Sequence, residues 1–584
     1  MLLNFCLLDA DCIEEAGKPL VRLWGVSESG KSVCVLTESE PYFYALPKGS
    51  AKKAEAEIKK ELAGKKQDII RIETVKRKLG SEEKTFLKIF CNLPADVQKV
   101  RGLVKTLSEA EEQYEYSINF YRRFLIDNRF SGLQWLIIDG DEIKTDYAVD
   151  RAIKAVKISS SDIEKNPKMK ILAFDTETFE EAGKSRLTMI SLASDNLDKV
   201  LTYGKTSFAS AEILNDEKQM LERFVEIVRE QNPDIILSYN GDGFDFALMQ
   251  ERALELKTKL ALGRDGSNMK FERRARTSSA RIAGRAHIDL YGFISNVLGA
   301  QLQTETLSLD AVSAELLGDK KIEMDFGRIM EDWRGKKDLA KLAEYCLKDS
   351  RLALRLGDFI LPQIFELSRL VGQAPFDVSR MTYSQLVEWF LSGRAFALRT
   401  IIPNQPKFAE IEIRRRKPKY IGGYVKEPIG GIHEGIAVLD FRSLYPSIIA
   451  TFNISPETLD CGKKESGFLV PESKRWFCRE EGFVSGAIRE LIERRIGMKK
   501  KLKTINDGEE WRRLKNGELS LKTVTNACYG YFAFSGSRWY CRECAESAAA
   551  FGRFFIKKII AEAEKEGFVV IYCDTDSVFL KLKS

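Results

Sequence analysis

Histidine and long apolar runs are nearly absent from this sequence. The 584 residues include two histidines, His287 and His433, so a zinc site would need four cysteines and is a minor alternative. The apolar run at the N-terminus ends at Asp9 with no basic leader before it, which argues against a signal peptide. No later run approaches the roughly 20 apolar residues of a transmembrane helix. We therefore expect a cytoplasmic protein.

Net charge is also low, and the cysteine count is odd. Eleven cysteines are an odd number in a long chain, which is typical of reduced, mostly buried thiols. Two spacings stand apart, because Cys541 and Cys544 form a C-x-x-C pair and Cys461 and Cys478 bracket one loop-like segment. The 92 basic and 86 acidic residues leave a net charge of +6, which permits a polyanionic partner without requiring one. Charged residues make up 30% of the chain and are rich in Lys and Glu, as is common in proteins of thermophiles.

The chain is long enough for several domains. With 44% hydrophobic residues it can bury three or more cores. Short β-type runs and a helical stretch over 50–65 predict an N-terminal α+β domain over 1–165. A section in which apolar runs alternate with helical patterns follows over 166–360, as in α/β folds. Strands and long basic helices continue from 404 to the end.

A first set of carboxylates follows apolar strands. In ILAFDTET, Asp175 and Glu177 stand at i and i+2 at a strand end, so both side chains leave one face. Another apolar strand precedes Asp245, and a helical run puts Tyr345 and Asp349 one turn apart. Such oxygens suit divalent ions that activate water for phosphodiester hydrolysis. Asp-x-Glu alone is more often a turn or a helix cap, but the order of these pieces favours a metal-dependent nuclease.

A second set of carboxylates lies in the last third of the chain. The strand IAVLD delivers Asp440 before a turn and a helix that begins near Tyr445. The run FVVIYCDTDSVFLKL predicts a hairpin whose tip carries Asp574 and Asp576, beside the end of another strand. D-T-D alone is more often an acidic turn. Together with the Asp440 segment, it predicts a second site for two metal ions.

Basic residues at helical spacing lie between these two motifs. Lys522, Asn526 and Tyr529 follow i, i+4, i+7 and share one helix face. Arg495 and Lys499 stand one turn apart on an earlier helix. Fixed cations of this kind can bind a triphosphate and stabilise the charge that shifts during phosphoryl transfer. A basic helix is more often a solvated surface, but its place between the acidic motifs favours the phosphate role.

These motifs resemble those of known families. The first set is similar to the DEDD exonucleases, with Tyr345 rather than a histidine orienting the attacking water. The segment GRAHIDLYGF, which contains Asp289, looks like part of a polymerase-linked proofreading domain. The segments DFRSLYPSII and CDTDS, with the K-x-x-x-N-x-x-Y-G signature over 522–530, resemble motifs of family B DNA polymerases. The resemblance covers nearly the whole chain. It is closest to archaeal members, most of all to the large chain of the split polymerase of methanogenic archaea.

The resemblance implies a DNA-directed DNA polymerase with a 3′–5′ proofreading exonuclease, and an α/β and α+β multidomain fold. A thumb, which the family has, is expected to be absent. The implied domains are an N-terminal α+β domain (1–165), an RNase H-like exonuclease domain (166–360), a return segment of the N-terminal domain and link (361–403), a palm (404–485 and 536–584) and helical fingers (486–535).

The resemblance also assigns residue roles. The implied catalytic residues are Asp440, Asp574 and Asp576 for synthesis, and Asp175, Glu177, Asp245, Tyr345 and Asp349 for proofreading. The implied ligands of two Mg²⁺ ions at each site, with Mn²⁺ as a substitute, are Asp440, Phe441, Asp574 and Asp576, and Asp175, Glu177 and Asp349. The implied contacts to dNTP and primer-template are Arg495, Lys499, Lys522, Asn526, Tyr529, Leu444, Tyr445, Tyr420, Gly422 and Gly423. The Tyr445 ring would exclude a ribose 2′-hydroxyl.

Archaeal relatives suggest two further features. Their cysteine pairs can be disulfides, so each of Cys541–Cys544 and Cys461–Cys478 is either a disulfide or a pair of buried thiols. Relatives also detect template uracil in an N-terminal pocket. Pro41, Tyr42 and Arg123 fall where that pocket is expected, although Cys12 stands where relatives often have a tyrosine.

The sequence stops just after the CDTDS motif, before a last palm segment or a thumb. We therefore expect a second polypeptide to supply these parts, with a truncated chain as the alternative. A sliding clamp is a further expected partner. Two other interpretations stay open: an exonuclease whose polymerase half is inactive alone, and a non-catalytic assembly subunit. Intact acids at both sites disfavour the second of these.

Overall fold

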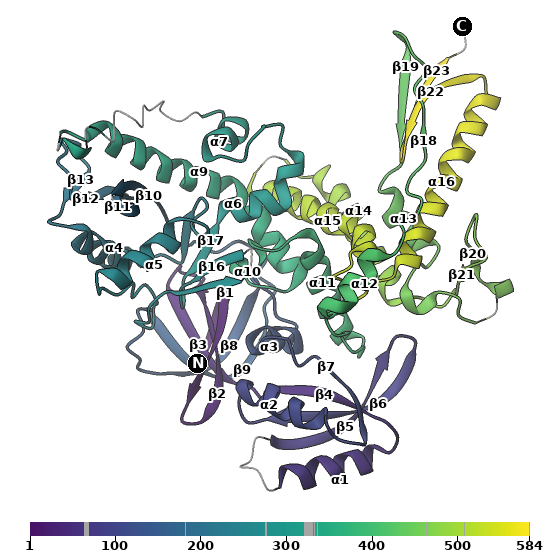
Figure 1. Ribbon diagram of the computed structural model, residues 1–584, viewed down its shortest axis with the longest axis horizontal. Coiled ribbons are helices and arrows are strands. Elements are labelled where there is room, and N and C mark those ends of the chain that lie inside the picture. Colours follow the sequence, from purple (N-terminus) through teal and green to yellow (C-terminus); the bar gives the residue numbers. More distant parts are fainter. Residues whose placement is uncertain are drawn as a thin grey trace. The chain divides into compact units, whose positions relative to one another are not determined.

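The chain forms two compact units, each built from two stretches of sequence. The computed structural model describes residues 1–582 except 64–68, 182, 275–276, 320–330, 332, 336, 463 and 507. One unit comprises Met1–Ser39 and Phe120–Thr382, and the other comprises Glu40–Asn119 and Tyr383–Ser584. Both mix helices and strands (Figure 1). Among the described residues, no helix combines the length and the apolar content needed to cross a bilayer. The finer domain boundaries stay predictions.

The first unit begins with a closed five-stranded barrel. Its order is β1-β2-β3-β9-β8, and the strands are β1 (Leu2–Glu15), β2 (Lys18–Ser27), β3 (Ser32–Glu38), β8 (Trp135–Glu142) and β9 (Arg151–Ser160). The two residues of the β1–β2 turn, Ala16 and Gly17, both have positive φ, which matches the twist of a tight hairpin. Phe5, Leu23 and Ile138 pack in one core with helix α3 (Phe120–Asn128).

A six-stranded sheet in the same unit carries the first carboxylate pair. Its order is β13-β12-β11-β10-β14-β17, and the strands are β10 (Ile171–Glu181), β11 (Lys184–Ser194), β12 (Leu197–Thr202), β13 (Ala211–Ile213), β14 (Ile235–Ser238) and β17 (Ala286–Asp289). Helices α4 (Glu217–Gln231) and α5 (Asp245–Glu255) cover one face, and α9 (Ala340–Val371) covers the other (Figure 1). Both faces are therefore apolar, as in other sheets buried on two sides.

Strand alternation decides the direction of each side chain on β10. Leu172 and Phe174 belong to the core that contains α4 and α5. Since successive side chains alternate between faces, Asp175 and Glu177 point to the face covered by α9. The sequence prediction that both carboxylates share one face is therefore confirmed by the register of β10.

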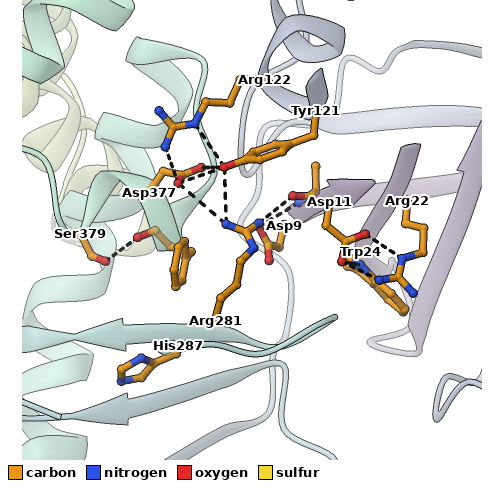
Figure 2. Close-up of polar contacts among 12 residues, drawn as sticks. Asp9, Asp11, Arg22, Trp24, Tyr121, Arg122, Arg281, His287, Asp377 and Ser379 are labelled. Carbon is orange, nitrogen blue, oxygen red and sulfur yellow. Dashed lines mark hydrogen bonds and ion pairs between the residues drawn. The ribbon is translucent and has the colours of Figure 1, made fainter. Parts of the chain in front are cut away.

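A buried ion network joins the barrel and α3 to β16 and α10 (Figure 2). Arg281, the last residue of β16 (Thr277–Arg281), donates to Asp9 of β1 at 3.0 Å. Arg122 and Tyr121 of α3 donate to Asp377 of α10 (Pro375–Val378) at 2.5 and 3.3 Å. Asp9 and Asp377 are almost inaccessible to solvent. Each buried carboxylate thus has a cationic partner, which offsets the cost of its desolvation.

The remaining elements of the first unit connect these parts. Among the described residues they are β15 (Lys270–Arg274), α6 (Leu290–Phe293), the π-helical turn at Ile294–Leu298, the 3₁₀ turn at Gly299–Gln301 and α7 (Leu309–Leu317). Ser308 caps α7 by accepting a hydrogen bond from Ala311 N, and Gly318 ends it in the left-handed conformation.

Two four-stranded sheets lie in the described residues of the second unit. One has the order β5-β6-β4-β7, and its strands are β4 (Tyr42–Pro47), β5 (Ile69–Leu79), β6 (Glu82–Cys91) and β7 (Ala110–Tyr114). Helices α1 (Ala51–Leu62) and α2 (Pro94–Val104) share a core with it. Helix α1 falls within the predicted helical stretch over 50–65.

The other sheet of this unit carries the second carboxylate set. Its order is β18-β22-β23-β19, and its strands are β18 (Val425–Lys426), β19 (Ile436–Asp440), β22 (Phe568–Asp574) and β23 (Ser577–Leu582). The hairpin predicted at CDTDS is confirmed by the β22–β23 pairing. The helices of this part are α11 (Tyr383–Ala397), α12 (Phe408–Arg416), α13 (Leu444–Thr451), α14 (Phe483–Leu502), α15 (Glu509–Ala533) and α16 (Arg542–Lys565). Short turns at Pro456–Thr458 and Lys464–Ser466 and a hairpin of β20 (Phe468–Leu469) and β21 (Trp476–Phe477) complete it.

Candidate active sites

The first acidic cluster lies where β10 packs on α9. Three possible ligand atoms lie within 4.8 Å of one another: a carboxylate oxygen of Asp175, a carboxylate oxygen of Glu177 and the sulfur of Cys346. Carboxylate oxygens at this spacing fit a divalent cation, because Mg²⁺ and Mn²⁺ prefer oxygen ligands. Cys346 is fully buried on α9 and was not predicted.

A pocket of about 460 Å³ adjoins this cluster. Its lining residues are Asp175, Tyr239, Asn240, Tyr291, Leu307, Ser308, Leu309 and Asp349. The Tyr239 hydroxyl donates to the Leu307 carbonyl at 2.6 Å, and its ring lies edge-on to Tyr291 at 5.8 Å. The pocket therefore combines two carboxylates with two aromatic rings, a surface on which nucleobases can stack.

Only part of the predicted first set lines this pocket. Asp349 does, whereas Tyr345, four residues earlier on α9, is 8% exposed and outside the lining. Asp245, the first residue of α5, is also outside it and accepts a hydrogen bond from the hydroxyl of Thr176. Burial raises the pKa of Asp245 to about 7. In the structure this carboxylate thus bonds to Thr176 and does not line the pocket.

Asp289 and His287 support the loop that carries Asn240. Asp289 accepts hydrogen bonds from the backbone nitrogens of Asn240 and Asp242, at 2.8 and 3.0 Å. His287 is inaccessible to solvent and lies 2.8 Å from the Ser238 hydroxyl, and burial lowers its pKa to about 4. Both residues therefore hold the loop after β14 by hydrogen bonds, and neither lines the pocket.

The second acidic cluster opens into a pocket of about 540 Å³. Its lining residues are Asp440, Phe441, Arg442, Ser443, Leu444, Tyr445, Pro446, Arg495, Lys499, Lys522, Asn526 and Asp576. The structure thus brings nine of the predicted residues to one cavity. The predicted residues outside the lining are Asp574, Tyr529, Tyr420, Gly422 and Gly423.

Strand pairing places the carboxylates of this pocket. Asp440 ends β19 opposite Ser577 of β23, and the Phe441 nitrogen donates to the Asp576 carbonyl at 2.8 Å. Burial and the negative charges of Asp440 and Asp574 raise the pKa of Asp576. Neighbouring carboxylates repel one another when ionised, and a bound divalent cation removes this repulsion. These residues therefore fit a metal site.

Three cations from two helices line the same pocket and form its cationic wall. Arg495 of α14 donates through Nη1 to the Ser443 hydroxyl at 3.0 Å and through Nε to Glu518 at 2.8 Å. Lys499, one turn later, lies 3.6 Å from the same Glu518 oxygen. Lys522 of α15 completes the positive wall. Glu518 was not predicted, although it stands four residues before Lys522 and so lies on the same helix face.

Most of the predicted residues that do not line the pocket pack close to residues that do. The Tyr529 ring stacks on Tyr445, and its hydroxyl lies 3.2 Å from that of Tyr420. Arg553 of α16 donates to the carbonyl of Gly422 at 2.8 Å. A Cβ on Gly423 would lie 2.6 Å from the Thr575 hydroxyl oxygen. The YIGGY segment therefore packs directly on the turn that carries Asp574 and Asp576.

Comparison with known proteins places both sites in one family. The model described as DNA polymerase family B, exonuclease domain, matches residues 111–312, and the one described as DNA polymerase family B matches 378–584. A DNA polymerase of Pyrococcus glycovorans is 36% identical over 580 residues, which are 98% of this chain and 70% of that protein. DNA polymerase 1 of Pyrococcus abyssi is 36% identical over 581 residues, 98% of this chain and 71% of that protein. The solved family B DNA polymerase of the hyperthermophilic archaeon Pyrobaculum calidifontis has a TM-score of 0.85 and 28% identity, and the match covers 100% of this chain and 75% of that chain.

The chain belongs to DNA polymerase family B.

Membership confirms the main prediction. The protein is a DNA-directed DNA polymerase with a 3′–5′ exonuclease domain, and its relatives are archaeal and thermophilic. Its substrates are DNA and dNTPs, and both catalytic domains of the family depend on metal ions. In the relatives, the matched region lies within one longer chain. The comparisons therefore give no support to a polymerase split between two chains.

The cysteine pairs of this family B polymerase differ from each other. Cys461 and Cys478 form a disulfide across the segment that contains β20. Cys541 and Cys544 are free, buried thiols. A hydrogen bond with Cys544 lowers the pKa of Cys541. In the structure the C-x-x-C pair is thus two thiols, whose sulfurs are hydrogen-bonded at the start of α16.

The predicted uracil-pocket residues belong to different units. Pro41 and Tyr42 lie in the second unit, where the Tyr42 ring packs on Phe90 and the Lys88 ammonium lies 3.8 Å from its centroid. Arg123 lies in the first unit, is 4% exposed and pairs with Asp127 at 2.9 Å. The uracil pocket stays a prediction.

Proposed function

We propose that the 540 Å³ pocket adds nucleotides and that the 460 Å³ pocket removes mispaired ones, each with bound Mg²⁺. The observation that supports the first assignment is that Asp440 and Asp576 line the same pocket as Arg495, Lys499 and Lys522. An acidic wall and a cationic wall in one cavity suit a metal–triphosphate complex. Bound Mg²⁺ would activate the attacking oxygen and stabilise the leaving oxygen.

In the 540 Å³ synthesis pocket, we assign a role to each residue from its position in or beside the lining. Asp440, Asp576 and the backbone of Phe441 would hold the metal ions, with Asp574 in support. The three cations would bind the triphosphate, because fixed positive groups stabilise charge that shifts during transfer. The backbone around Leu444 would contact the same phosphates. Tyr445 would lie under the sugar, where its ring excludes a 2′-hydroxyl, while Asn526, Tyr529, Tyr420, Gly422 and Gly423 would border the base pair and template.

In the editing pocket, Asp175, Glu177 and Asp349 would hold the metal ions. Tyr345 would orient the attacking water, and Asp245 would act through its hydrogen bond with Thr176. Tyr239 and Tyr291 would stack on bases of the primer end, since they line the pocket beside Asp175. Mn²⁺ would substitute for Mg²⁺ at both sites, because both ions prefer carboxylate oxygens.

Primer extension tests the synthesis site. With Mg²⁺ and all four dNTPs, Lys499→Ala should raise the dNTP KM by about tenfold, since one charge-assisted phosphate contact is lost. Lys500→Ala is the matched control, because Lys500 is exposed on the same helix but outside the pocket lining. No extension by the chain, either alone or with proteins from its source, would contradict the assignment. Equal effects of the two substitutions would contradict the role of Lys499.

We also propose that further polypeptide covers the sheet that contains β19. Val438 and Leu439 of β19 are 54% and 52% exposed, and nearby Ile432 is 98% exposed. Exposed apolar side chains on an edge strand favour an interface. A second chain that supplies the thumb and the rest of the palm is the predicted occupant. The native mass of the protein purified from its source tests this, and a mass equal to one 584-residue chain would contradict it.

Three predictions about the cell and template remain part of this proposal. A sliding clamp would hold the enzyme on DNA in the cytoplasm. Pro41, Tyr42 and Arg123 would bind uracil in the template. Uracil placed about four bases ahead of the primer end should then stall extension, whereas thymine at that position should not. Equal extension on both templates would contradict uracil sensing.

A further inference from the structure

A buried carboxylate lies behind the cationic wall of the synthesis pocket. Glu518 is 4% exposed on α15. One of its oxygens accepts from Arg495 at 2.8 Å and lies 3.6 Å from the Lys499 ammonium, and the other oxygen lies 3.6 Å from Lys515. Three cations therefore converge on one anion. Burial would raise the pKa of Glu518, but the hydrogen bond from Arg495 and the nearby charges hold it below its usual range.

The contact with Arg495 fixes the direction of that side chain. Its guanidinium is bound on two sides, through Nε to Glu518 and through Nη1 to the Ser443 hydroxyl. Arg495 is only 12% exposed. A planar guanidinium held at two of its nitrogens has little freedom to rotate. Its remaining N–H groups are thereby preorganised at the pocket that Arg495 lines.

The contact with Lys499 is of a different kind. This ammonium is 44% exposed and lies at ion-pair rather than hydrogen-bond distance from Glu518. A lysine side chain is flexible, so Lys499 can leave Glu518 for another anion in the pocket. A phosphate group that binds there must compete with Glu518 for the same ammonium. Glu518 thus lowers the positive potential of the wall while it orders Arg495.

We propose that Glu518 is a positioning residue of the phosphate wall, which anchors Arg495 and competes with the incoming triphosphate for Lys499. The inference rests on the proposed function of this pocket. The competition weakens phosphate binding and so favours release of the pyrophosphate product. The anchoring keeps Arg495 oriented when no nucleotide is bound.

Binding of inorganic tripolyphosphate to the full chain tests this by calorimetry, without DNA. Glu518→Gln keeps the acceptor for Arg495 and removes the charge, so binding should tighten by about three- to tenfold. Glu518→Asp keeps the charge and should not tighten binding. Glu518→Ala removes both charge and acceptor, and should bind at least about threefold more weakly than the Gln variant. Glu490→Gln is the matched control, because Glu490 pairs with Arg394 and Arg494 outside the pocket.

The outcomes separate this inference from the proposed function. If Arg495→Ala and Lys522→Ala both leave tripolyphosphate binding unchanged, the phosphate site itself is wrong. If they weaken binding while Glu518→Gln fails to tighten it, only the competition is wrong. An Ala variant that binds as tightly as the Gln variant would overturn the anchoring. In primer extension, Glu518→Gln should lower the dNTP KM and strengthen inhibition by pyrophosphate, a pattern that a purely structural defect would not give.

Discussion

The ring of Tyr445 stacks on the ring of Tyr529, with centroids 4.0 Å apart and an angle of 11° between the planes. Gly552 of α16 lies behind Tyr445, and a Cβ there would come within 3.2 Å of its ring. Tyr445 is therefore held between two helices, so its ring can act as a fixed wall of the synthesis pocket. Tyr529, outside the lining, contributes by holding that wall.

Removing this wall should admit ribonucleotides. Tyr445→Ala should raise the use of rNTP relative to dNTP by about 100-fold, equivalent to about 2.7 kcal/mol of lost discrimination. Tyr445→Phe, which keeps the ring, should stay selective. Primer extension with each nucleotide measures the ratio of kcat/KM values. Unchanged selectivity in the Ala variant would show that another group excludes the 2′-hydroxyl.

Gly423 should be needed for the position of the Asp574–Asp576 turn. A methyl group on Gly423 would lie 2.6 Å from the Thr575 hydroxyl oxygen and would displace the turn. Gly423→Ala should lower kcat for synthesis by about 10- to 100-fold, because misplacement of reacting groups by about 1 Å costs this much, and should spare the exonuclease. Gly430→Ala is the control, since a Cβ there meets nothing within 4 Å. Equal rates for the two variants would count against the contact.

His287 should make the stability of the first unit depend on pH. Its folded-state pKa is lowered from 6.5 to about 4 by burial, so protonation opposes folding. The stability that neutral His287 provides is fully present above pH 6.5 and is lost as pH falls towards 4, by about 1.4 kcal/mol per pH unit. The free energy of unfolding, measured in urea between pH 6.5 and 4.5, should depend less steeply on pH in His287→Gln than in the wild type. The difference in slope should correspond to about one proton fewer taken up on unfolding. Parallel curves would refute this.

The Cys461–Cys478 disulfide should stabilise the second unit. It closes a loop with a sequence separation of 17 residues, for which chain entropy predicts about 3 kcal/mol. Reductant should lower the urea midpoint of the wild type and have no effect on Cys461→Ala/Cys478→Ala. Cys12→Ser, at an exposed free thiol, should respond to reductant as the wild type does. A midpoint independent of reductant would contradict the prediction.

Local sequence patterns predicted much of both sites. The alternation of β10 was enough to place Asp175 and Glu177 on one face, and helical spacing was enough to place Lys522 and Asn526 in one pocket. These predictions depend only on the periodicity of a strand or a helix. They need no knowledge of how distant segments pack.

Contacts between distant segments were not predictable in this way. Asp245 follows a strand as expected, yet its carboxylate turns to Thr176 on a different strand. Tyr239 enters the editing pocket because its hydroxyl reaches the backbone of Leu307, 68 residues later. Glu518 is an exception that helical spacing could have revealed, since it precedes Lys522 by one turn. What spacing could not show is that a cation from α14 pairs with it.

The central claim is that one chain carries two separate metal-dependent sites. One end-labelled primer-template, followed in Mg²⁺ with and without dNTPs, measures synthesis and degradation on the same gel. Asp440→Ala should lower extension by at least about 1,000-fold and leave degradation within twofold of wild type, and Asp175→Ala should do the reverse. Loss of both activities to the same extent in each variant would contradict the two-site account.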